Sequence, residues 1–344
     1  MPIELTSLSD LAALPYDDII DVRSPAEYAT DHIPTALSLP ALFNEERARV
    51  GTIYVQDDPF AARKIGAALV SRNVAAHLEG PLADKPGGWR PLVYCWRGGQ
   101  RSGSVAIILK QIGWRADTIT GGYQSYRRLV ARALYDDPMP CPVILIDGGT
   151  GTAKTRLLDH LASQGAQTLD LEAMAEHRGS LFGPMSLNQP AQKAFESRLA
   201  MSMATLNPAK PVYVEAESSK IGRIIIPPTL WQAMRTAPTH RLNAPLSARA
   251  EHLLTAYPDM IENRDKLDAT LSQLTRYHGH EQINAWRDLS ATGAFSTLAQ
   301  QLIQTHYDPR YARISRASVL HNHDLPDLSD RTLSAAAAQI INSK

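Results

Sequence analysis

Three prolines in the segment 136–142 divide this 344-residue chain into two parts. The stretch before them, residues 123–135, has helical features, and a proline prevents a helix from continuing because it lacks a backbone N–H and clashes with the preceding turn. A new apolar strand follows at 143–147. A chain of this length is also too long for one ordinary hydrophobic core. The sequence therefore predicts a first domain over residues 1–135, a linker over 136–142, a second domain over 143–323 and a C-terminal tail or helix over 324–344.

Short apolar strands alternate with helical segments in both predicted domains. In the first domain, helical segments separate strand-like runs at 19–22, 37–40, 92–94 and 118–120. The second domain begins with the strand at 143–147, has another at 211–214, and is predominantly helical from 248 to about 304. Such alternation is typical of α/β domains with mainly parallel sheets. We therefore predict an α/β fold for both domains, with a helical part toward the C-terminus.

The charge balance and the number of cysteines indicate which binding partners and which cellular compartment to expect for this protein. Thirty-five basic residues balance thirty-five acidic ones, so no overall field would collect nucleic acid or membrane lipid non-specifically. A nucleic-acid site must then be a local patch. The two cysteines, Cys95 and Cys141, make no disulfide framework, which favours a reducing compartment. Because residues 1–10 lack a signal-peptide pattern and no apolar run approaches the roughly 20 residues that span a bilayer, we expect a cytoplasmic protein with no membrane partner.

A loop rich in glycine and arginine begins at Cys95. The strand 92–94 ends there, and the sequence Cys-Trp-Arg-Gly-Gly-Gln-Arg-Ser leads into an apolar, helix-like run. The glycines let successive N–H groups turn inward, while Arg97, Arg101 and the helix N-terminus supply positive potential that favours a thiolate. A lone cysteine is more often an inert residue of the core. In this setting, however, the sequence predicts that Cys95 is a nucleophile in an anion-binding loop with Arg97 and Arg101.

A second glycine-rich loop follows the strand at 143–147. Its sequence, Gly-Gly-Thr-Gly-Thr-Ala-Lys-Thr from 148 to 155, has the form of a phosphate-binding P-loop at a helix N-terminus. The loop departs from the usual pattern at Ala153, where a glycine normally precedes the lysine. A glycine-rich turn without a ligand is the alternative. We predict an oligophosphate site formed by Gly148, Gly149, Gly151, Lys154 and Thr155.

Acidic residues follow the strand 211–214. An acid at the end of a strand beside a P-loop can hold Mg²⁺ directly or through water, and Glu215 and Glu217 are both candidates. We count both with the cofactor-binding residues. The sequence predicts no dedicated metal site, and Mg²⁺ is an optional companion of the phosphate ligand.

Further basic and hydroxyl side chains occur where a substrate could contact them. One loop, 177–183, combines charge, hydroxyl and glycine as a substrate-facing loop would. The segments 276–280 and 306–311 mix tyrosine with basic residues, which suits unpaired RNA bases and phosphates. An ordinary solvated surface is the alternative for all of these segments. The predicted substrate contacts are Arg127, Arg128, Arg178, Ser180, Lys220 and Arg223.

Several motifs together resemble known families. The segments 21–28 and 32–36 and the Cys95 loop look like the rhodanese fold over about residues 3–130. With the motifs that begin at 121, 148, 177 and 215, the chain resembles the bacterial tRNA 2-selenouridine synthases over nearly its whole length. The resemblance implies a rhodanese-like domain followed by a P-loop NTPase-like α/β domain.

The resemblance also implies a two-step modification of the wobble 2-thiouridine of tRNA. Geranyl diphosphate first alkylates the sulfur, and selenium from selenophosphate then replaces the S-geranyl group to give 2-selenouridine. By this resemblance Lys154 and Thr155 bind the diphosphate, Cys95 transfers selenium, and Arg97 and Arg101 bind selenophosphate. The partners are tRNA and an enzyme that supplies selenophosphate. No cofactor is tightly bound, since geranyl diphosphate and selenophosphate are co-substrates.

Two other enzyme classes fit parts of the sequence. Cys95 and Arg101 have the Cys-x5-Arg spacing of cysteine-dependent phosphatases, some of which are built on a rhodanese fold. A phosphatase, however, has no use for a fused P-loop domain. A small-molecule or nucleoside kinase with a rhodanese module is the second alternative. The resemblance over the whole chain favours the tRNA-modifying transferase.

Overall fold

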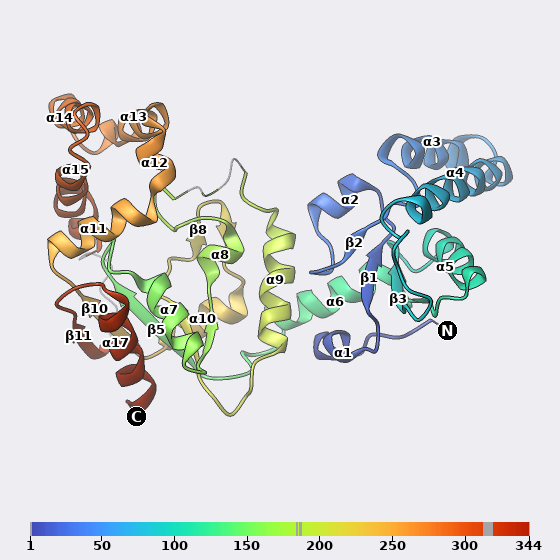
Figure 1. Ribbon diagram of the computed structural model, residues 1–344, viewed down its shortest axis with the longest axis horizontal. Helices are drawn as coiled ribbons and strands as arrows, with labels where there is room; N and C mark the ends of the chain where they lie inside the picture. The colour runs from blue at the N-terminus through green and yellow to red at the C-terminus, as the bar shows by residue number, and fades with distance from the viewer. Residues whose placement is uncertain (1, 184, 186–187, 312–318, 344) are drawn as a thin grey trace. The chain divides into compact units, whose positions relative to one another are not determined.

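The chain forms two compact units in the computed structural model (Figure 1), which describes residues 2–183, 185, 188–311 and 319–343. The first unit ends at Pro138, inside the proline-rich segment, and also contains a later segment. The second unit contains the rest of the chain. By residue number, the first unit comprises 1–138 and 190–205, and the second comprises 139–189 and 206–344.

Helix α9 (Gln192–Ala204) belongs to the first unit although it follows the P-loop in sequence. It packs on α1 (Leu8–Ala13) and α6 (Gly122–Tyr135), and Phe195 is among its buried residues. The expected division differs here, because it assigned residues 190–205 to the second domain. A linear division cannot detect a segment that returns to an earlier part of the fold.

A parallel four-stranded sheet forms the centre of the first unit. Ile20 of one central strand lies opposite Val93 of the other, so the carboxyl ends of both strands share one edge. Cys95 follows a central strand at that edge. The strand order is β2 (Leu37–Ser38), β1 (Asp18–Asp21), β3 (Pro91–Tyr94) and β4 (Asp117–Thr118). The other helices are α2 (Pro25–Thr30), α3 (Asn44–Gln56), α4 (Pro59–Glu79) and α5 (Gln100–Ile112).

Local sequence signals explain α2 but not α3. Helix α2 begins with Pro25 after Ser24, as the sequence predicts, and the Glu27 carboxylate accepts a hydrogen bond from the Ser24 N–H at 3.0 Å. Helix α3, in contrast, was not expected. None of its residues is fully buried, and Val50 is the one that packs against the core cluster as a partly buried side chain, so the hydrophobic periodicity of this segment is weak.

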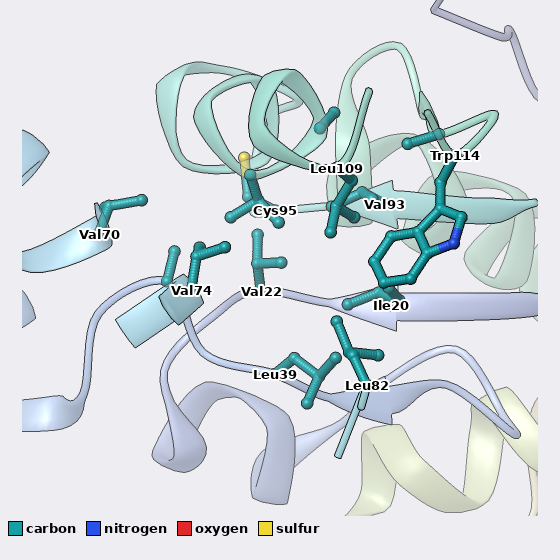
Figure 2. Close-up of a cluster of buried hydrophobic side chains, with 14 of the residues drawn as sticks. Ile20, Val22, Leu39, Val70, Val74, Leu82, Val93, Cys95, Leu109 and Trp114 are labelled. Carbon is teal, nitrogen blue, oxygen red and sulfur yellow. The ribbon is translucent and has the colours of Figure 1, made fainter. Parts of the chain in front are cut away.

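The core of the first unit includes Cys95. Figure 2 shows Cys95 among Val22, Val74, Val93 and Leu109, which belong to one cluster of buried side chains. Only 3% of the Cys95 surface is exposed. Packing therefore fixes the position of the thiol.

A parallel five-stranded sheet forms the centre of the second unit. The strand before the P-loop lies in the middle of this sheet, as expected for a buried apolar run. The edge strand β11 was not expected, because Leu-His-Asn-His has no apolar run. The strand order is β11 (Val319–Asp324), β10 (Thr239–Asn243), β5 (Val143–Gly148), β7 (Val212–Glu215) and β6 (Gln167–Leu169), and β8 (Lys220–Ile221) pairs separately with β9 (Ile224–Ile225).

Helices surround this sheet and extend the unit toward the C-terminus. The α-helices are α7 (Lys154–Ser163), α8 (Leu171–Ala175), α10 (Pro228–Thr236), α11 (Leu246–Ala256), α12 (Pro258–Glu262), α13 (Arg264–Ser272), α14 (His280–Ala291), α15 (Phe295–Leu302), α16 (Asp308–Tyr311) and α17 (Asp330–Asn342), with a 3₁₀-helix η1 (Gln273–Arg276) and a π-helix η2 (Ile303–Tyr307).

The C-terminal residues are part of the core of the second unit. Helix α17 packs on α7, and its buried residues include Leu333, Ala337 and Ile340. The region 324–344 is thus integrated into the unit that the sequence division treated as ending before it. Among the helices that the structure describes, none has both the length and the apolar character to cross a membrane.

Candidate active site

The sulfur of Cys95 sits in a loop of hydrogen-bond donors. Its Sγ accepts a hydrogen bond from the Gly99 N–H at 3.3 Å and another from the Ser102 hydroxyl at 3.2 Å. Helix α5 starts one residue after Gly99, so its N-terminus lies beside the sulfur. Both donors and the helix N-terminus direct positive potential toward the sulfur. The sequence prediction gave Ser102 no role of its own, although it is the last residue of the loop motif.

Two glycines fix the shape of the Cys95 loop. Gly98 has φ +66°, and a Cβ there would lie 2.5 Å from the carbonyl oxygen of Ile119. Gly122 has φ +57°, and a Cβ there would lie 2.2 Å from the carbonyl oxygen of Cys95. Both positions therefore require glycine. Gly122 belongs to the motif that begins at residue 121, so the geometry of the Cys95 loop accounts for this residue of the motif.

The two arginines of the loop have different environments. Arg101 donates a hydrogen bond to Glu27 at 2.8 Å, and Arg47 also pairs with Glu27 at 3.1 Å. Burial acts to raise the pKa of Glu27, but Arg101, the Ser24 N–H and Arg47 outweigh it and hold the pKa at about 2. The charge of Arg101 is therefore compensated. Arg97 is exposed and has no ion pair with any residue in the described ranges.

The two predicted substrate contacts on α6, Arg127 and Arg128, have different environments. Arg127 pairs closely with Glu196 of α9 and lies 4.0 Å from Asp31, and only 19% of its side chain is exposed. Two carboxylates therefore compensate the charge of Arg127, and its role as a substrate contact stays a prediction. Arg128 is exposed and donates a hydrogen bond only to the Gln124 carbonyl, at 3.2 Å, among the residues that the structure covers.

The P-loop of the second unit connects β5 to α7. Lys154, the first residue of α7, donates a hydrogen bond from Nζ to the Gly148 carbonyl at 3.1 Å. Gly151 has φ +84°, and a Cβ there would lie 2.8 Å from the carbonyl oxygen of Arg249. At Gly148, a Cβ would lie 2.4 Å from Thr152 Oγ1. The glycines thus permit the tight turn that a phosphate-binding loop needs.

Ala153 is the strained residue of this loop. Its φ of 60° and ψ of 37° are left-handed, a conformation that costs a residue with a Cβ roughly 1–2 kcal/mol. The backbone therefore adopts the conformation that the usual glycine would supply. Alanine in place of glycine therefore raises the free energy of this backbone conformation but does not alter the conformation of the loop.

Three carboxylates and a hydroxyl face one another beside Lys154. Thr155 donates a hydrogen bond to Glu215 Oε1 at 2.6 Å, and oxygens of Glu172, Glu215 and Glu217 all lie within 4.8 Å of one another. The other Glu215 oxygen is buried without a hydrogen-bond partner among the described atoms. Glu172, from the start of α8, was not predicted. Its only sequence signal is its position just after β6, a strand the sequence analysis did not find.

The charges in this cluster depend on one another. Burial raises the pKa values of both Glu172 and Glu215. Repulsion from Glu215 and Glu217 raises the pKa of Glu172 further, whereas Lys154 and the Thr155 hydrogen bond only partly offset the rise at Glu215. Burial acts to lower the pKa of Lys154, but nearby acidic groups, led by Tyr311 and Glu215, outweigh it and raise that pKa. The lysine is therefore cationic at neutral pH. Three carboxylates whose oxygens lie this close together offer the hard oxygen donors that a divalent cation such as Mg²⁺ prefers.

Residues far along the chain hold the P-loop in place. Arg249 donates a hydrogen bond to the Thr150 carbonyl at 2.9 Å and pairs with Asp308 at 2.6 Å. Tyr311 donates to the Asp147 carboxylate and accepts a hydrogen bond from the Gly148 N–H at 3.3 Å. Asp308 and Tyr311 belong to a segment that the sequence assigned to RNA stacking or to surface. In the structure both residues support the P-loop, and a contact with RNA stays a prediction.

Arg178 and Ser180 lie at the P-loop cavity, a space of about 850 Å³ that Lys154, Thr155 and Glu217 also line. Arg178 pairs with Asp259 at 3.0 Å. The loop that carries both residues approaches the carboxylates at Gly179, where a Cβ would lie 2.6 Å from Glu172 Oε1. The predicted substrate-facing loop is therefore part of the same site.

Lys220 and Arg223 are exposed at the β8–β9 hairpin and do not line that cavity. Arg223 donates hydrogen bonds from its backbone N–H, at 2.8 Å, and from its guanidinium to Gln189. These two predicted contacts are thus surface residues, separate from the phosphate loop.

Comparison with known proteins identifies the class of both units. Residues 4–129 match the rhodanese-like domain, and residues 141–287 match the AAA domain of tRNA 2-selenouridine synthases. With the Cys95 loop and the Lys154 loop, this match defines a protein that joins a rhodanese-like domain to a P-loop domain.

Similarity to whole proteins extends the match. The chain is 37% identical over 259 residues to the tRNA 2-selenouridine synthase of Nitrosomonas europaea, covering 73% of this chain and 66% of that protein. It is 37% identical over 259 residues to that of Aeromonas salmonicida, covering 74% and 69%. With that of Bdellovibrio bacteriovorus it shares 30% identity over 341 residues, covering 85% and 87%. The chain belongs to the tRNA 2-selenouridine synthase family and is an enzyme of tRNA modification.

Proposed function

We propose that the chain converts the wobble 2-thiouridine of tRNA to 2-selenouridine in two steps, with one step assigned to each unit. The observation that carries the proposal is the presence of two separate glycine-rich loops in one chain, each at a helix N-terminus. One loop offers a sulfur nucleophile, and the other offers a lysine beside a hydroxyl and carboxylates. The first suits selenium transfer, and the second suits a diphosphate leaving group. We place the reaction in the cytoplasm, with selenophosphate supplied by another enzyme.

The first step is S-alkylation with geranyl diphosphate. The 2-thio sulfur attacks the first carbon of the geranyl group, the bond from that carbon to oxygen breaks, and diphosphate leaves with the electron pair. Lys154 and the N–H groups of the loop would stabilise the departing charge. The Glu172, Glu215 and Glu217 carboxylates, with Thr155, would hold Mg²⁺, which supplies further charge neutralisation to a bound diphosphate.

The second step replaces the alkylated sulfur with selenium. Alkylation turns sulfur into a leaving group, so the selenium of selenophosphate can take its place at C2 and geranylthiol departs. Water cleaves the phosphorus–selenium bond and phosphate is released. Cys95 and the donors of its loop would position selenophosphate so that its selenium faces C2, and selenium stays bonded to phosphorus until water cleaves that bond. Of the two arginines in the Cys95 loop, Arg97 is the one that would bind selenophosphate, because Arg101 already forms an ion pair with Glu27.

Nucleoside mass spectrometry of tRNA tests this division. In cells that carry only the Cys95→Ala variant, 2-selenouridine should disappear while S-geranylated uridine accumulates. The Cys141→Ala variant is the matched control, because Cys141 is the other buried cysteine and lies outside both loops. Normal 2-selenouridine in the Cys95→Ala strain would contradict the role of Cys95. Absence of both modified nucleosides from cells with the unaltered protein would contradict the proposed function as a whole.

A further inference from the structure

An apolar groove begins where the P-loop cavity ends. It lies among α11, α12, α13 and α15, and Phe182 and Leu298 are two of its lining residues. Thr150, Leu253, Tyr257 and Tyr307 line both the groove and the P-loop cavity. The two spaces therefore meet at the P-loop itself.

The chemistry changes sharply across that boundary. The cavity presents Lys154, Arg178 and carboxylates, whereas Thr150 and the two tyrosines carry the only oxygen or nitrogen atoms on side chains among the described residues that line the groove. Tyr257 lies on the border, because its hydroxyl shares a hydrogen bond with Ser180 at 3.2 Å. A polar group placed deeper in the groove would lose its hydrogen bonds to water without replacement.

The junction is close to the phosphate loop. The side chain of Leu253 approaches Gly151 so nearly that a Cβ on the glycine would lie 3.2 Å from Leu253 Cγ. Leu253 is half-buried, as are Phe295 and Ile261 along the groove. These side chains remain partly open to solvent, although Met260, Leu267 and Leu298 beside them are buried in one apolar cluster. A ligand with an anionic head at Lys154 and an apolar tail would cover them.

We propose that this groove binds the hydrocarbon tail of the organic diphosphate whose head group is held by the P-loop. This inference rests on the proposed use of a diphosphate substrate and adds the site that recognises the rest of the molecule. A nucleotide fits less well, since a base in the groove would leave its donors and acceptors unpaired. The helical extension of the second unit is thus the specificity element for an allylic diphosphate.

Competition binding on the full-length protein, with Mg²⁺ present, tests the inference. The ligands are inorganic diphosphate, dimethylallyl diphosphate, geranyl diphosphate and ATP. Each buried CH₂ group strengthens binding roughly fourfold, so geranyl diphosphate should bind at least about 100-fold more tightly than inorganic diphosphate. Equal binding of these two ligands, or tighter binding of ATP, would overturn the inference. If no diphosphate binds, the proposed function fails, and the groove assignment fails with it.

Substitutions on α15 locate the tail. Ala299 lines the groove and is 8% exposed, so Ala299→Phe should fill it and reduce the preference for geranyl over inorganic diphosphate at least about tenfold. Affinity for inorganic diphosphate should not change. Thr297→Phe, on the exposed side of the same helix, is the matched control and should preserve the preference. A folded Ala299→Phe protein with unaltered preference would refute the assignment.

A second variant covers the case in which Ala299→Phe does not fold. Phe295→Ala removes a ring from the groove wall and should strengthen binding of a fifteen-carbon diphosphate relative to geranyl diphosphate. The same ratio in Phe295→Ala and the unaltered protein would count against the groove as the tail site.

Discussion

Replacing Ser197 with alanine tests whether α9 is an integral part of the first unit. Ser197 donates a hydrogen bond to Asp31 Oδ2 at 3.0 Å, and Tyr123 donates to the same oxygen at 2.5 Å. Both Ser197 and Asp31 are 1% exposed. Burial raises the pKa of Asp31, and the hydrogen bonds from Tyr123 and Ser197 oppose that rise. Ser197→Ala therefore removes one of the few groups that stabilise a buried carboxylate.

The expected cost follows from this geometry. A hydrogen bond to a charged group contributes about 1.5–3 kcal/mol, and the better helix propensity of alanine returns about 0.5 kcal/mol. The free energy of unfolding of the first unit should therefore fall by roughly 1–2.5 kcal/mol. Each 1.4 kcal/mol is a factor of ten, so amides that exchange only when this unit unfolds should exchange about 5- to 70-fold faster.

Hydrogen exchange measured by mass spectrometry distinguishes the two units. Peptides that contain β1 and β3 should lose protection, whereas those that contain β5 and β10 should not. Ser202→Ala is the matched control, because Ser202 lies on the same helix and its side chain makes no hydrogen bond with the described residues. Loss of protection in β5 and β10, or no change anywhere, would refute the assignment of α9 to the first unit.

Three further outcomes follow from the sites. Lys154→Ala should slow geranylation by one to two orders of magnitude, since a charge-assisted contact is worth about 1.5–3 kcal/mol; tRNA that is already geranylated should still be converted to the seleno form, which nucleoside mass spectrometry would detect. Arg128→Gln should reduce the slope of log binding constant against log salt concentration for tRNA by roughly 0.7–0.9. Arg127→Gln should mainly reduce thermal stability, because Arg127 pairs with Glu196. Equal effects of the two variants on that slope would contradict this distinction. Glu27→Gln should reduce unfolding free energy at neutral pH by about 1.5–3 kcal/mol. Because the folded-state pKa of Glu27 is about 2, below the unfolded value of 4.5, this difference should vanish as pH falls from about 4.5 to 2, and a pH-independent difference in denaturant titrations would exclude the ion-pair explanation.

The sequence by itself determined the two glycine-rich loops and the class of the fold. Each loop consists of the end of a strand, a glycine-rich turn and a helix N-terminus within about a dozen residues. Neighbouring residues in the sequence therefore specify its backbone conformation. The positions of Cys95, Lys154 and Thr155 follow from that pattern, and Glu215 follows from the end of a neighbouring parallel strand. The resemblance to the tRNA 2-selenouridine synthases rests on the same local motifs.

Tertiary structure alone decided what surrounds those loops. The pairing of Arg101 with Glu27 joins residues 74 positions apart, and the contact between Ser197 and Asp31 joins residues 166 apart. Periodicity and motif spacing carry no information about such pairs, because each partner is unremarkable in its own segment. The third carboxylate, Glu172, and the apolar groove beside the P-loop arise in the same way. The local sequence therefore fixes where the reactive groups lie along the chain, and the packing of distant segments decides their charge, their partners and the space left for a ligand.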